Sequence, residues 1–517
     1  MNVFRKTRTC YLFFFLAITT VTYAHGDRDD IFYNIKDYGA KGDGSTSDTK
    51  SINAAIAAAA SSGGGTVYFP AGHFLSGAIH LESNITLYID RGAILIAAPA
   101  DASAEYDKTE SAINDKFQDF GHSHFHNSLI WGENLHDISI IGSGMIWGKG
   151  LINGYKGDSE KEINMPNKAI ALLSCRNVTI RDITIFKGGW FAILATGVDN
   201  LTIDNITIDT NRDGMDIDCC KNVHISNCFV NSPGDDGICL KSSFALGYAR
   251  STENVTITNC HVSGYDEGTL LDGTFKREDK NRHAPIGRIK FGTESNGGFQ
   301  NIAISNCVFD YCRGLALETV DGALLEDVTI TNITMRDITN SPLFIRLGAR
   351  MRAPETMQPG VCRRIMISNV NIYNAYVDST ASIISGNPGL YIEDLKLSNV
   401  HIYYKGGGTK EMASVKVPGF EKNYPEPYKF GPIPAYGFFI RHVKNLEMND
   451  VSVSFLDDDF RPPFILEDVR GATLRNIKAR KMEGVPYFIL DKVVDFSIRD
   501  SKGISDKQIK NSSHQSF

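Results

Sequence analysis

A short segment of alternating apolar residues ending in Asn or Asp recurs along most of this 517-residue chain. The copies read VTIRDI, LTIDNI, VHISNC, VTITNC, IAISNC, VTITNI, IMISNV, LKLSNV and ATLRNI. Asp182, Asn205 and Asn227, at the fifth position of the first three copies, are 23 and 22 residues apart, and later spacings are longer. A repeat of this length with a period of two, and with no helical pattern between the copies, predicts a parallel β-solenoid.

In such a solenoid, every second residue of a copy points inward, and the stacked coils build one continuous core. The recurring Asn would lie at a corner, where its amide bonds the Asn of the coils above and below and satisfies polar groups that would otherwise be buried unpaired. Cys228, Cys260 and Cys307 follow Asn in matching copies, which predicts stacked, buried thiols. A β-sandwich would not keep one turn residue in register over so many copies.

The two ends of the chain differ from the repeats. The Ala-rich segment 48–60 predicts a helix that caps the open amino-terminal end of the solenoid. After about Asp500 the chain is polar, and we expect it to fray. We therefore predict a leader at 1–24, a single solenoid domain at 25–504 and a polar tail at 505–517.

The leader assignment rests on a basic start, an apolar stretch at 11–21 and Ala24 at a plausible cleavage point. The apolar stretch is short for a membrane span. These features predict a signal peptide and export, to the periplasm or out of the cell, with no membrane partner.

Charge and cysteine content narrow the function classes. Loss of three basic leader residues would change the formal net charge from −7 to −10, which disfavours nucleic acid as a partner. Nine of the ten cysteines would remain, and an odd number argues against a fully paired disulfide framework.

Two acidic clusters follow successive copies, Asn211–Asp216 and Gly234–Gly237. An isolated Asp-Gly pair commonly does no more than turn the chain. Two such clusters one coil apart, however, would bring Asp213, Asp235 and Asp236 together. Neighbouring carboxylates push their pKa values apart, so that one keeps a proton while another stays ionised. Hydrolysis of a glycosidic bond requires this pairing.

The segments YGAKGDG and GGGTVYFPAG within 38–72, and ISIIGSGMIWGKG at 138–150, resemble glycoside hydrolase family 28, the polygalacturonases and rhamnogalacturonan hydrolases. The two acidic clusters resemble the family's Asn-Thr-Asp motif, with Arg212 in place of Thr, and its paired-aspartate motif. The resemblance covers essentially the whole mature chain. It implies a right-handed parallel β-helix and a hydrolase of pectic glycans that inverts the anomeric centre, and we expect no cofactor and no metal ion.

By this resemblance, Asp235 would be the general acid, and Asp213 and Asp236 would hold and deprotonate the attacking water. Asn211 resembles the residue that supports them by hydrogen bonding. The family's Gly-His-Gly motif is missing, and Ile286 stands in the place of its histidine. His261 or His283 would be substitutes, although a loop histidine is more often simply solvated.

The family's Arg-Ile-Lys motif, which grips the uronate carboxylate of polygalacturonate, is replaced by a segment with Ala316 and Glu318. A carboxylate at Glu318 suits the hydroxyls of a neutral sugar. One coil earlier, Arg288 and Lys290 would point outward beside the aspartates, as would Lys241. We therefore expect relocated cationic recognition of a uronate-containing glycan, with solvated surface cations as the alternative.

The charged segment 264–285 lies next to the expected site and would form a wall that favours removal of terminal sugars. Two other functions stay open. A pectate lyase would use the three aspartates to bind calcium and Lys241 or Arg288 as a base. A non-catalytic glycan-binding solenoid is the third reading.

Overall fold

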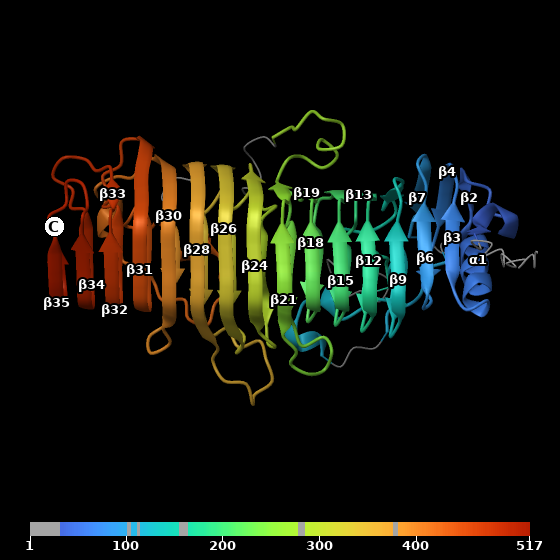
Figure 1. Cartoon of the computed structure of the whole chain (residues 1–517), viewed down its shortest axis with the longest axis horizontal. Helices are drawn as coiled ribbons and strands as arrows, with labels where there is room; N and C mark the ends of the chain where they lie inside the picture. The colour runs from blue at the N-terminus through green and yellow to red at the C-terminus, as the bar shows by residue number, and fades with distance from the viewer. Residues whose placement is uncertain (1–31, 101–104, 111–113, 155–163, 278–284, 376–380) are drawn as a thin grey trace, which may run out of the picture.

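The computed structural model describes residues 32–100, 105–110, 114–154, 164–277, 285–375 and 381–517. Within them, short strands wind into one long parallel β-helix (Figure 1). Three parallel sheets run its length, and we call them the floor, front and flank sheets. The predicted solenoid is confirmed by the register of successive coils, in which Val178 pairs with Leu201 and Leu201 with Val223.

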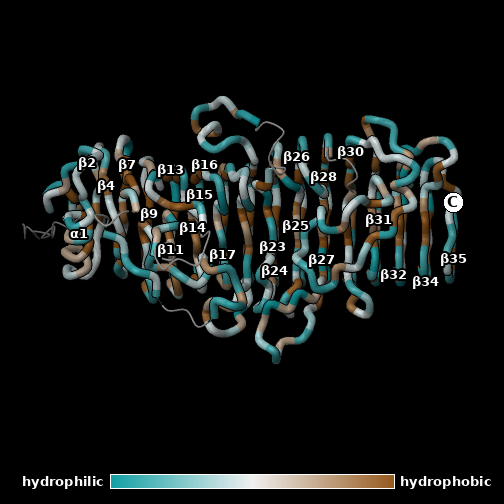
Figure 2. The backbone as a smooth tube through the Cα atoms, turned by 180° about the vertical axis from the view of Figure 1, so that it is seen from behind, coloured by the Kyte–Doolittle hydropathy of each residue, from teal (hydrophilic) through white to brown (hydrophobic). Residues whose placement is uncertain are grey.

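The floor sheet faces the viewer in Figure 2. It contains β5 (Ile79–His80), β8 (Ile130–Glu133), β11 (Lys168–Leu173), β14 (Phe191–Thr196), β17 (Asp213–Asp218), β20 (Ile238–Ser242), β23 (Ile289–Ser295), β25 (Leu315–Thr319), β27 (Leu343–Leu347) and β29 (Ser382–Ser385). The front sheet contains β1 (Phe32–Asn34), β3 (Gly65–Phe69), β6 (Ile85–Ile89), β9 (His136–Ile141), β12 (Arg176–Arg181), β15 (Asp199–Asp204), β18 (Lys221–Ser226) and β21 (Thr252–Thr258).

The flank sheet contains β2 (Asp43–Ser47), β4 (Gly72–Ser76), β7 (Ala93–Ala97), β10 (Met145–Trp147), β13 (Thr184–Phe186), β16 (Thr207–Asp209), β19 (Phe229–Asn231), β22 (His261–Ser263) and β33 (Lys478–Ala479). Longer strands then bend around the corners and join two or three sheets. They are β24 (Phe299–Asp310), β26 (Leu324–Ile338), β28 (Val361–Ala375), β30 (Ile392–Gly406), β31 (Phe438–Asp457), β32 (Phe464–Arg475) and β34 (Phe488–Arg499).

The two ends of the β-helix are covered. Helix α1 (Thr49–Ser61) packs Ile52, Ile56 and Ala59 over the first coils, as the sequence predicted. The expectation of a frayed tail is wrong. Strand β35 (Lys507–Ser516) pairs antiparallel with β34, and the Phe517 ring stacks on Phe488 at 5.3 Å. Because the last coil leaves a row of unpaired backbone groups, a polar segment is still held there by main-chain hydrogen bonds.

The predicted Asn ladder is present at the corner between the front and flank sheets. Asn205 donates to Asp182 at 2.8 Å and Asn399 to Asn369 at 2.9 Å. These side chains are exposed, so the ladder does not rescue buried groups as expected. The corner instead requires a left-handed backbone, with φ 52° at Asn205, which Asn tolerates better than most residues. A second ladder, absent from our sequence analysis, runs from Asn177 to Asn301.

The described cysteines are free thiols, and all of them are buried, including the predicted stack of Cys228, Cys260 and Cys307. Short 3₁₀ helices lie in the loops that the structure describes: η1 (Ile35–Tyr38), η2 (Asp115–Phe117), η3 (Phe120–His122), η4 (Met412–Ser414) and η5 (Pro427–Phe430). In the described part of the chain, no helix is long and apolar enough to cross a membrane. The predicted signal peptide at 1–24 lies outside the described residues.

Candidate active site

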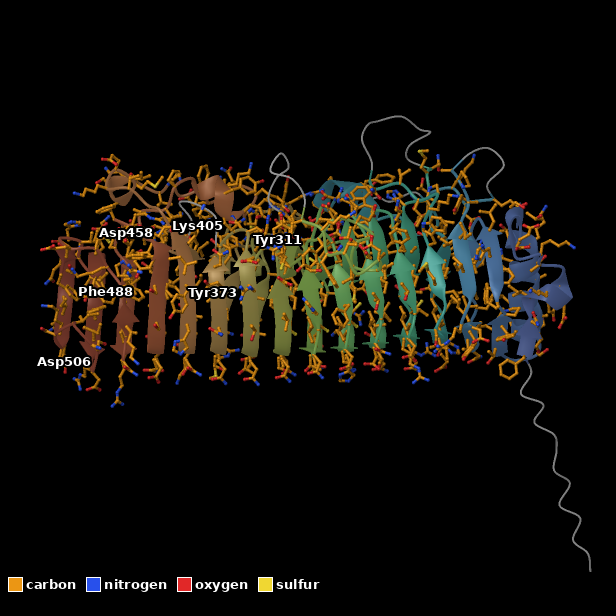
Figure 3. All side chains as sticks on the ribbon, turned by 90° about the horizontal axis from the view of Figure 1, so that it is seen from above. Tyr311, Tyr373, Lys405, Asp458, Phe488 and Asp506 are labelled. Atoms are coloured by element: carbon orange, nitrogen blue, oxygen red, sulfur yellow. The ribbon has the colours of Figure 1, made fainter. Side chains whose placement is uncertain are left out.

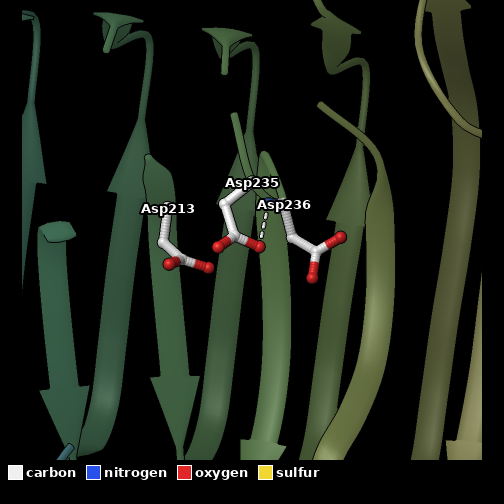
Figure 4. A group of neighbouring side chains, drawn as sticks. All are labelled: Asp213, Asp235 and Asp236. Carbon is white, nitrogen blue, oxygen red and sulfur yellow. Dashed lines mark hydrogen bonds between the residues drawn. The ribbon is translucent and has the colours of Figure 1, made fainter. Parts of the chain in front are cut away.

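Two loops at equivalent corners of neighbouring coils carry the three aspartates (Figure 4). Residues 210–212 join β16 to β17, which begins at Asp213, and residues 232–237, which include Asp235 and Asp236, join β19 to β20. One carboxylate oxygen from each aspartate lies within 4.8 Å of the others. The Asn211 carbonyl accepts from Gly234 N at 2.7 Å, so its main chain ties the two loops together. The aspartates that the sequence placed on consecutive coils thus converge.

Asp235 is the most exposed of the three, with 28% of its side chain accessible. Burial raises its pKa, and Arg212 opposes the rise with Nη2 at 2.7 Å from Oδ2. Asp213 is buried, and its nearest ion-pair contact is Arg212 at 3.9 Å. Burial, reinforced by Asp235 and Asp216, holds the pKa of Asp213 well above its ordinary value. These two carboxyls therefore retain protons more readily than a solvated aspartate.

Asp236 has the opposite electrostatic environment. Burial alone would raise its pKa, but Lys290 and Arg288 lower it below the ordinary value. Arg288 Nε donates to Oδ1 at 2.8 Å, and Lys290 Nζ lies 3.2 Å from Oδ2. The site thus holds one carboxylate with a lowered pKa within 4.8 Å of two whose pKa values are raised.

Cationic side chains on the outer face of the floor sheet form ion pairs with carboxylates of the protein itself. Arg288 is 1% exposed and donates to Glu426 as well as Asp236. Arg313 donates to the other oxygen of Glu426 at 2.9 Å. Both carboxylate partners of Arg288 thus belong to the protein itself, and its expected contact with substrate stays a prediction. Its side chain points outward, as parity predicted, but the loop that carries Glu426 covers it.

Lys241 and Glu318 are also withdrawn from solvent. Lys241 Nζ donates to Glu294 at 3.0 Å, and Glu318, fully buried, lies 3.8 Å from Lys290. Burial raises the pKa of Glu318 to about 7. Both side chains are thus paired within the protein, and their expected contact with substrate stays a prediction. Long side chains turned outward on a sheet become structural when a loop closes over them.

His122 is a residue that the sequence analysis missed. It lies at the end of η3, and its Nε2 is 2.8 Å from Oδ2 of buried Asp216. Asp216 lies on floor strand β17, three residues after Asp213. Of the proposed substitutes for the missing histidine, His261 packs against Phe229 on the flank, and His283 lies outside the described residues. A buried histidine in the long segment before the repeats gave no periodic signal.

A cavity of about 530 Å³ adjoins Asp235 on its carboxy-terminal side. Lys290 and Arg313 line it together with Gly234, Asp235, Ile286, Thr339, Asn340, Tyr424, Glu426 and Tyr428. Its outer wall comes from residues 407–437, between β30 and β31. Arg346 and Arg441 hold this loop by donating to the carbonyls of Phe420 and Pro418 at 3.0 and 2.8 Å.

Of the predicted wall, 264–285, the structure describes residues 264–277 and Pro285. Fully buried Asp209 accepts the backbone N–H groups of Gly268, Leu270 and Leu271 at 2.9, 3.1 and 3.2 Å. This anchor holds residues 268–271 over the flank sheet, and neither 264–277 nor Pro285 lines the cavity. Among the described residues, the wall of the cavity comes from 407–437 and not from 264–277.

The aspartates offer carboxylate oxygens of the kind that calcium prefers. Both oxygens of Asp236, however, are paired with cations, and Arg212 occupies Asp235. Three cationic groups within contact distance oppose the arrival of a divalent cation. The donor set therefore does not favour the calcium-dependent lyase.

Family models and known proteins with similar sequences agree with the β-helix fold and include polygalacturonases. A family model described as rhamnogalacturonase A/epimerase, pectate lyase-like matches residues 32–127, and one for a right handed beta helix region matches 121–276. The chain is 26% identical to a probable polygalacturonase of Vitis vinifera over 59% of its own length and 60% of that protein. It is 25% identical to an exopolygalacturonase of Platanus acerifolia over 74% and 94%.

Among solved structures, the family 28 exopolygalacturonase of Yersinia enterocolitica superposes with a TM-score of 0.62 at 18% identity, covering 87% of this chain and 78% of that one. At this identity the likeness speaks to fold, and it agrees with the right-handed parallel β-helix found here. The chain spans just under two thirds of the Vitis protein and nearly all of the Platanus one.

Proposed function

We propose that this chain, a member of glycoside hydrolase family 28, hydrolyses glycosidic bonds in pectic, galacturonate-containing glycans. The observation that carries the proposal is the convergence of Asp213, Asp235 and Asp236 with divided proton affinities. An acid that keeps its proton beside an ionised base is the requirement of this chemistry. The predicted leader, if it acts as proposed, would direct the enzyme out of the cytoplasm.

In the proposed mechanism, Asp235, the most accessible of the three, donates its proton to the glycosidic oxygen as the bond to the anomeric carbon breaks. A water between Asp213 and Asp236 attacks that carbon. Asp236 is the ionised partner and takes up the water proton, while Asp213 holds the water in place. One proton leaves Asp235, one reaches Asp236, and the resting state returns by exchange with solvent.

Uronate recognition is assigned to the cavity, whose two cations also pair with Asp236 and Glu426. Lys290 and Arg313 both line it, and Nε of Arg313 is buried without a hydrogen-bond partner in the described chain. Arg is well suited to carboxylate recognition, and Thr339 and Asn340 add neutral polar groups for hydroxyls. This arrangement fits one acidic sugar beside the scissile bond.

Residues 407–437, through Tyr424 and Tyr428, form a wall at one end of the cavity. Such a wall favours removal of terminal sugars, that is, exo-action. We expect digestion of galacturonate oligosaccharides to release one short product from the start, with inversion at the anomeric centre. The inverting outcome is taken from the family, because the oxygens within 4.8 Å are closer than the roughly 6.5–9.5 Å usual for inverting carboxyl pairs. Chromatography and proton NMR of early products measure both properties. A ladder of mixed lengths would refute exo-action, and a retained anomer would refute inversion.

Arg212 is the clearest departure within the acidic motifs, and its effect on pH dependence is testable. After burial, it is the main influence on Asp235, and it lowers that pKa. Replacing Arg212 by Thr should therefore raise the pKa of Asp235. Since Asp235 must be protonated, kcat/KM falls as pH rises through this pKa, and the alkaline limb should move to higher pH. The pH profile of kcat/KM measures this, and a limb that stays in place or moves down would contradict the assigned acid.

A further inference from the structure

One outward-facing position of the flank sheet stays in register across consecutive coils, and we call it the outer row. Its members, in order, are Trp147, Phe186, Asp209, Asn231, Ser263, Asp310, Arg336, Tyr373 and Tyr403. It lies at the edge of the flank sheet, just before the corner that leads to the aspartates. The row is therefore a line of side chains parallel to the solenoid axis, outside the catalytic cavity.

The middle of the outer row is covered by the protein's own insertion. Asp209 accepts three backbone N–H groups of that segment, and Asn231 Oδ1 accepts from Tyr265 N at 2.8 Å. The Tyr265 hydroxyl donates to Asp310. The chain itself thus seals the acidic part of the row.

The carboxy-terminal end of the outer row is open. Tyr373 and Tyr403 are 41% and 45% exposed, and their rings lie 6.0 Å apart on adjacent coils. The exposed Arg336 guanidinium lies 5.0 Å from the Tyr373 ring centroid. No carboxylate of the described residues forms a salt bridge with Arg336. Figure 3 labels Tyr373 on this part of the molecule. Two aromatic faces and one cation without a salt bridge to the described residues are thus presented to solvent side by side.

The other end of the row repeats this composition. Trp147 and Phe186 stack at 6.2 Å on adjacent coils, with the ammonium groups of Lys149 and Lys187 5.1 and 5.3 Å from the respective rings. A pair of aromatic rings with at least one cation nearby therefore occurs on both sides of the sealed middle. Isolated exposed rings are ordinary on protein surfaces. An in-register recurrence with cations is more specific.

We propose that Arg336, Tyr373 and Tyr403 form a second glycan-binding site, which holds an acidic polysaccharide outside the catalytic cavity. Sugar rings stack their C–H faces on aromatic rings, and the carboxylate of a uronic acid pairs with a guanidinium. Coils follow one another at about 4.8 Å, a spacing comparable to successive sugars of a linear chain. Both tyrosines stand on strands that pair with neighbours on both sides, so no free strand edge is offered here. The choice of an acidic polymer rests on the proposed function, whereas the site itself does not.

The test uses the full chain carrying Asp235→Asn, so that the polymer is not consumed, in gels cast with polygalacturonate. We expect retardation of this protein and roughly tenfold weaker retardation of its Tyr373→Ser/Tyr403→Ser derivative. Arg336→Gln should weaken binding to polygalacturonate but leave binding to its neutral methyl ester unchanged. Tyr88→Ser is the matched control. The rings of Tyr68 and Tyr88 also lie 6.0 Å apart on adjacent coils, but the charged group beside them is Asp90, which accepts from the Tyr68 hydroxyl, and not a cation.

Unchanged retardation of the double variant would overturn the proposal, as would an equal loss in the control. A Tyr373→Glu variant, which places a carboxylate in the site, should also lose retardation, and its retention at the parental level would likewise overturn it. A change in sedimentation of the double variant without a change in retardation would assign the surface to a second copy of the chain, against this proposal. Hydrolysis of a short oligosaccharide by otherwise unaltered enzyme should be the same with and without the two tyrosines. Parental enzyme that binds polymer but hydrolyses nothing would refute the proposed function and leave this site standing.

Discussion

Replacing Asp235 by Asn should lower kcat on a galacturonate oligosaccharide by about 10²–10⁴-fold, the usual contribution of a general acid. Asn keeps the size of the side chain and an oxygen that can accept from Arg212, which donates to Asp235 at 3.0 Å. It has no proton to give to the leaving oxygen. Release of reducing ends, measured under single-turnover and steady-state conditions, reports the loss.

The same substitution should stabilise the fold at neutral pH. Burial raises the folded-state pKa of Asp235 above its unfolded value. Ionisation of this carboxyl therefore lowers the stability of the fold as pH rises from the unfolded pKa to the folded pKa, and the full cost is present above the folded pKa. Asn removes this cost. Urea unfolding at pH 7 should therefore show a variant at least as stable as the parent, which separates lost chemistry from lost structure.

Asp204→Asn is a matched control for this experiment, because Asp204 accepts hydrogen bonds in the surface ladder, from Asn227 at 2.8 Å, away from the cavity. Its kcat should stay close to that of the parent. An Asp235→Asn enzyme that keeps more than half of the parental rate would remove Asp235 from the role of acid, and with it the proposed mechanism.

The coil architecture was readable from the sequence because it is a local, repeated requirement. Each copy must bury every second residue, and each corner needs a left-handed residue such as Asn205 or Asn227. The convergence of Asp213 with Asp235 follows from the same register, since both stand just after equivalent strands. The second ladder carried an equally regular signal, Asn177 to Asn301, five residues before the first, and was overlooked.

The surroundings of the aspartates could not be read in this way. His122 reaches Asp216 across 94 positions, and Glu426 reaches Arg288 across 138. Both come from segments without a repeat, whose paths are set by tertiary contacts rather than by local pattern. The alternation of inward and outward residues correctly predicted that Arg288 and Lys290 point out of the core. It could not predict that both side chains are buried. The loop at 407–437 covers the outward-pointing Arg288 and buries it. The sequence of this loop contains no repeat or motif that predicts its position.

That burial leads to the largest stability effect we expect. Arg288→Met should lower the free energy of unfolding at pH 7 by about 3–5 kcal/mol, because it leaves Asp236 and Glu426 as buried carboxylates without their shared cation. Urea unfolding measures the loss. Arg364→Met is the matched control: Arg364 also pairs with two carboxylates, but on the surface, and its removal should change stability far less.

The pH dependence gives this prediction its sharpest test. Cationic partners, Arg288 among them, outweigh burial and lower the folded-state pKa of Asp236 and Glu426, so their pairing stabilises the fold above the unfolded pKa and is lost as pH falls through the folded one. Without Arg288, both pKa values should rise and the carboxyls should take up protons at mildly acidic pH. The deficit of the variant should therefore shrink from pH 7 towards pH 4. Adding Glu426→Gln should recover part of the stability at pH 7, since one of the two buried carboxylates that lost Arg288 is then neutral. A deficit that is independent of pH, or a double variant weaker than the single one, would mean that Arg288 stabilises by packing and not by holding two carboxylates beside the catalytic site.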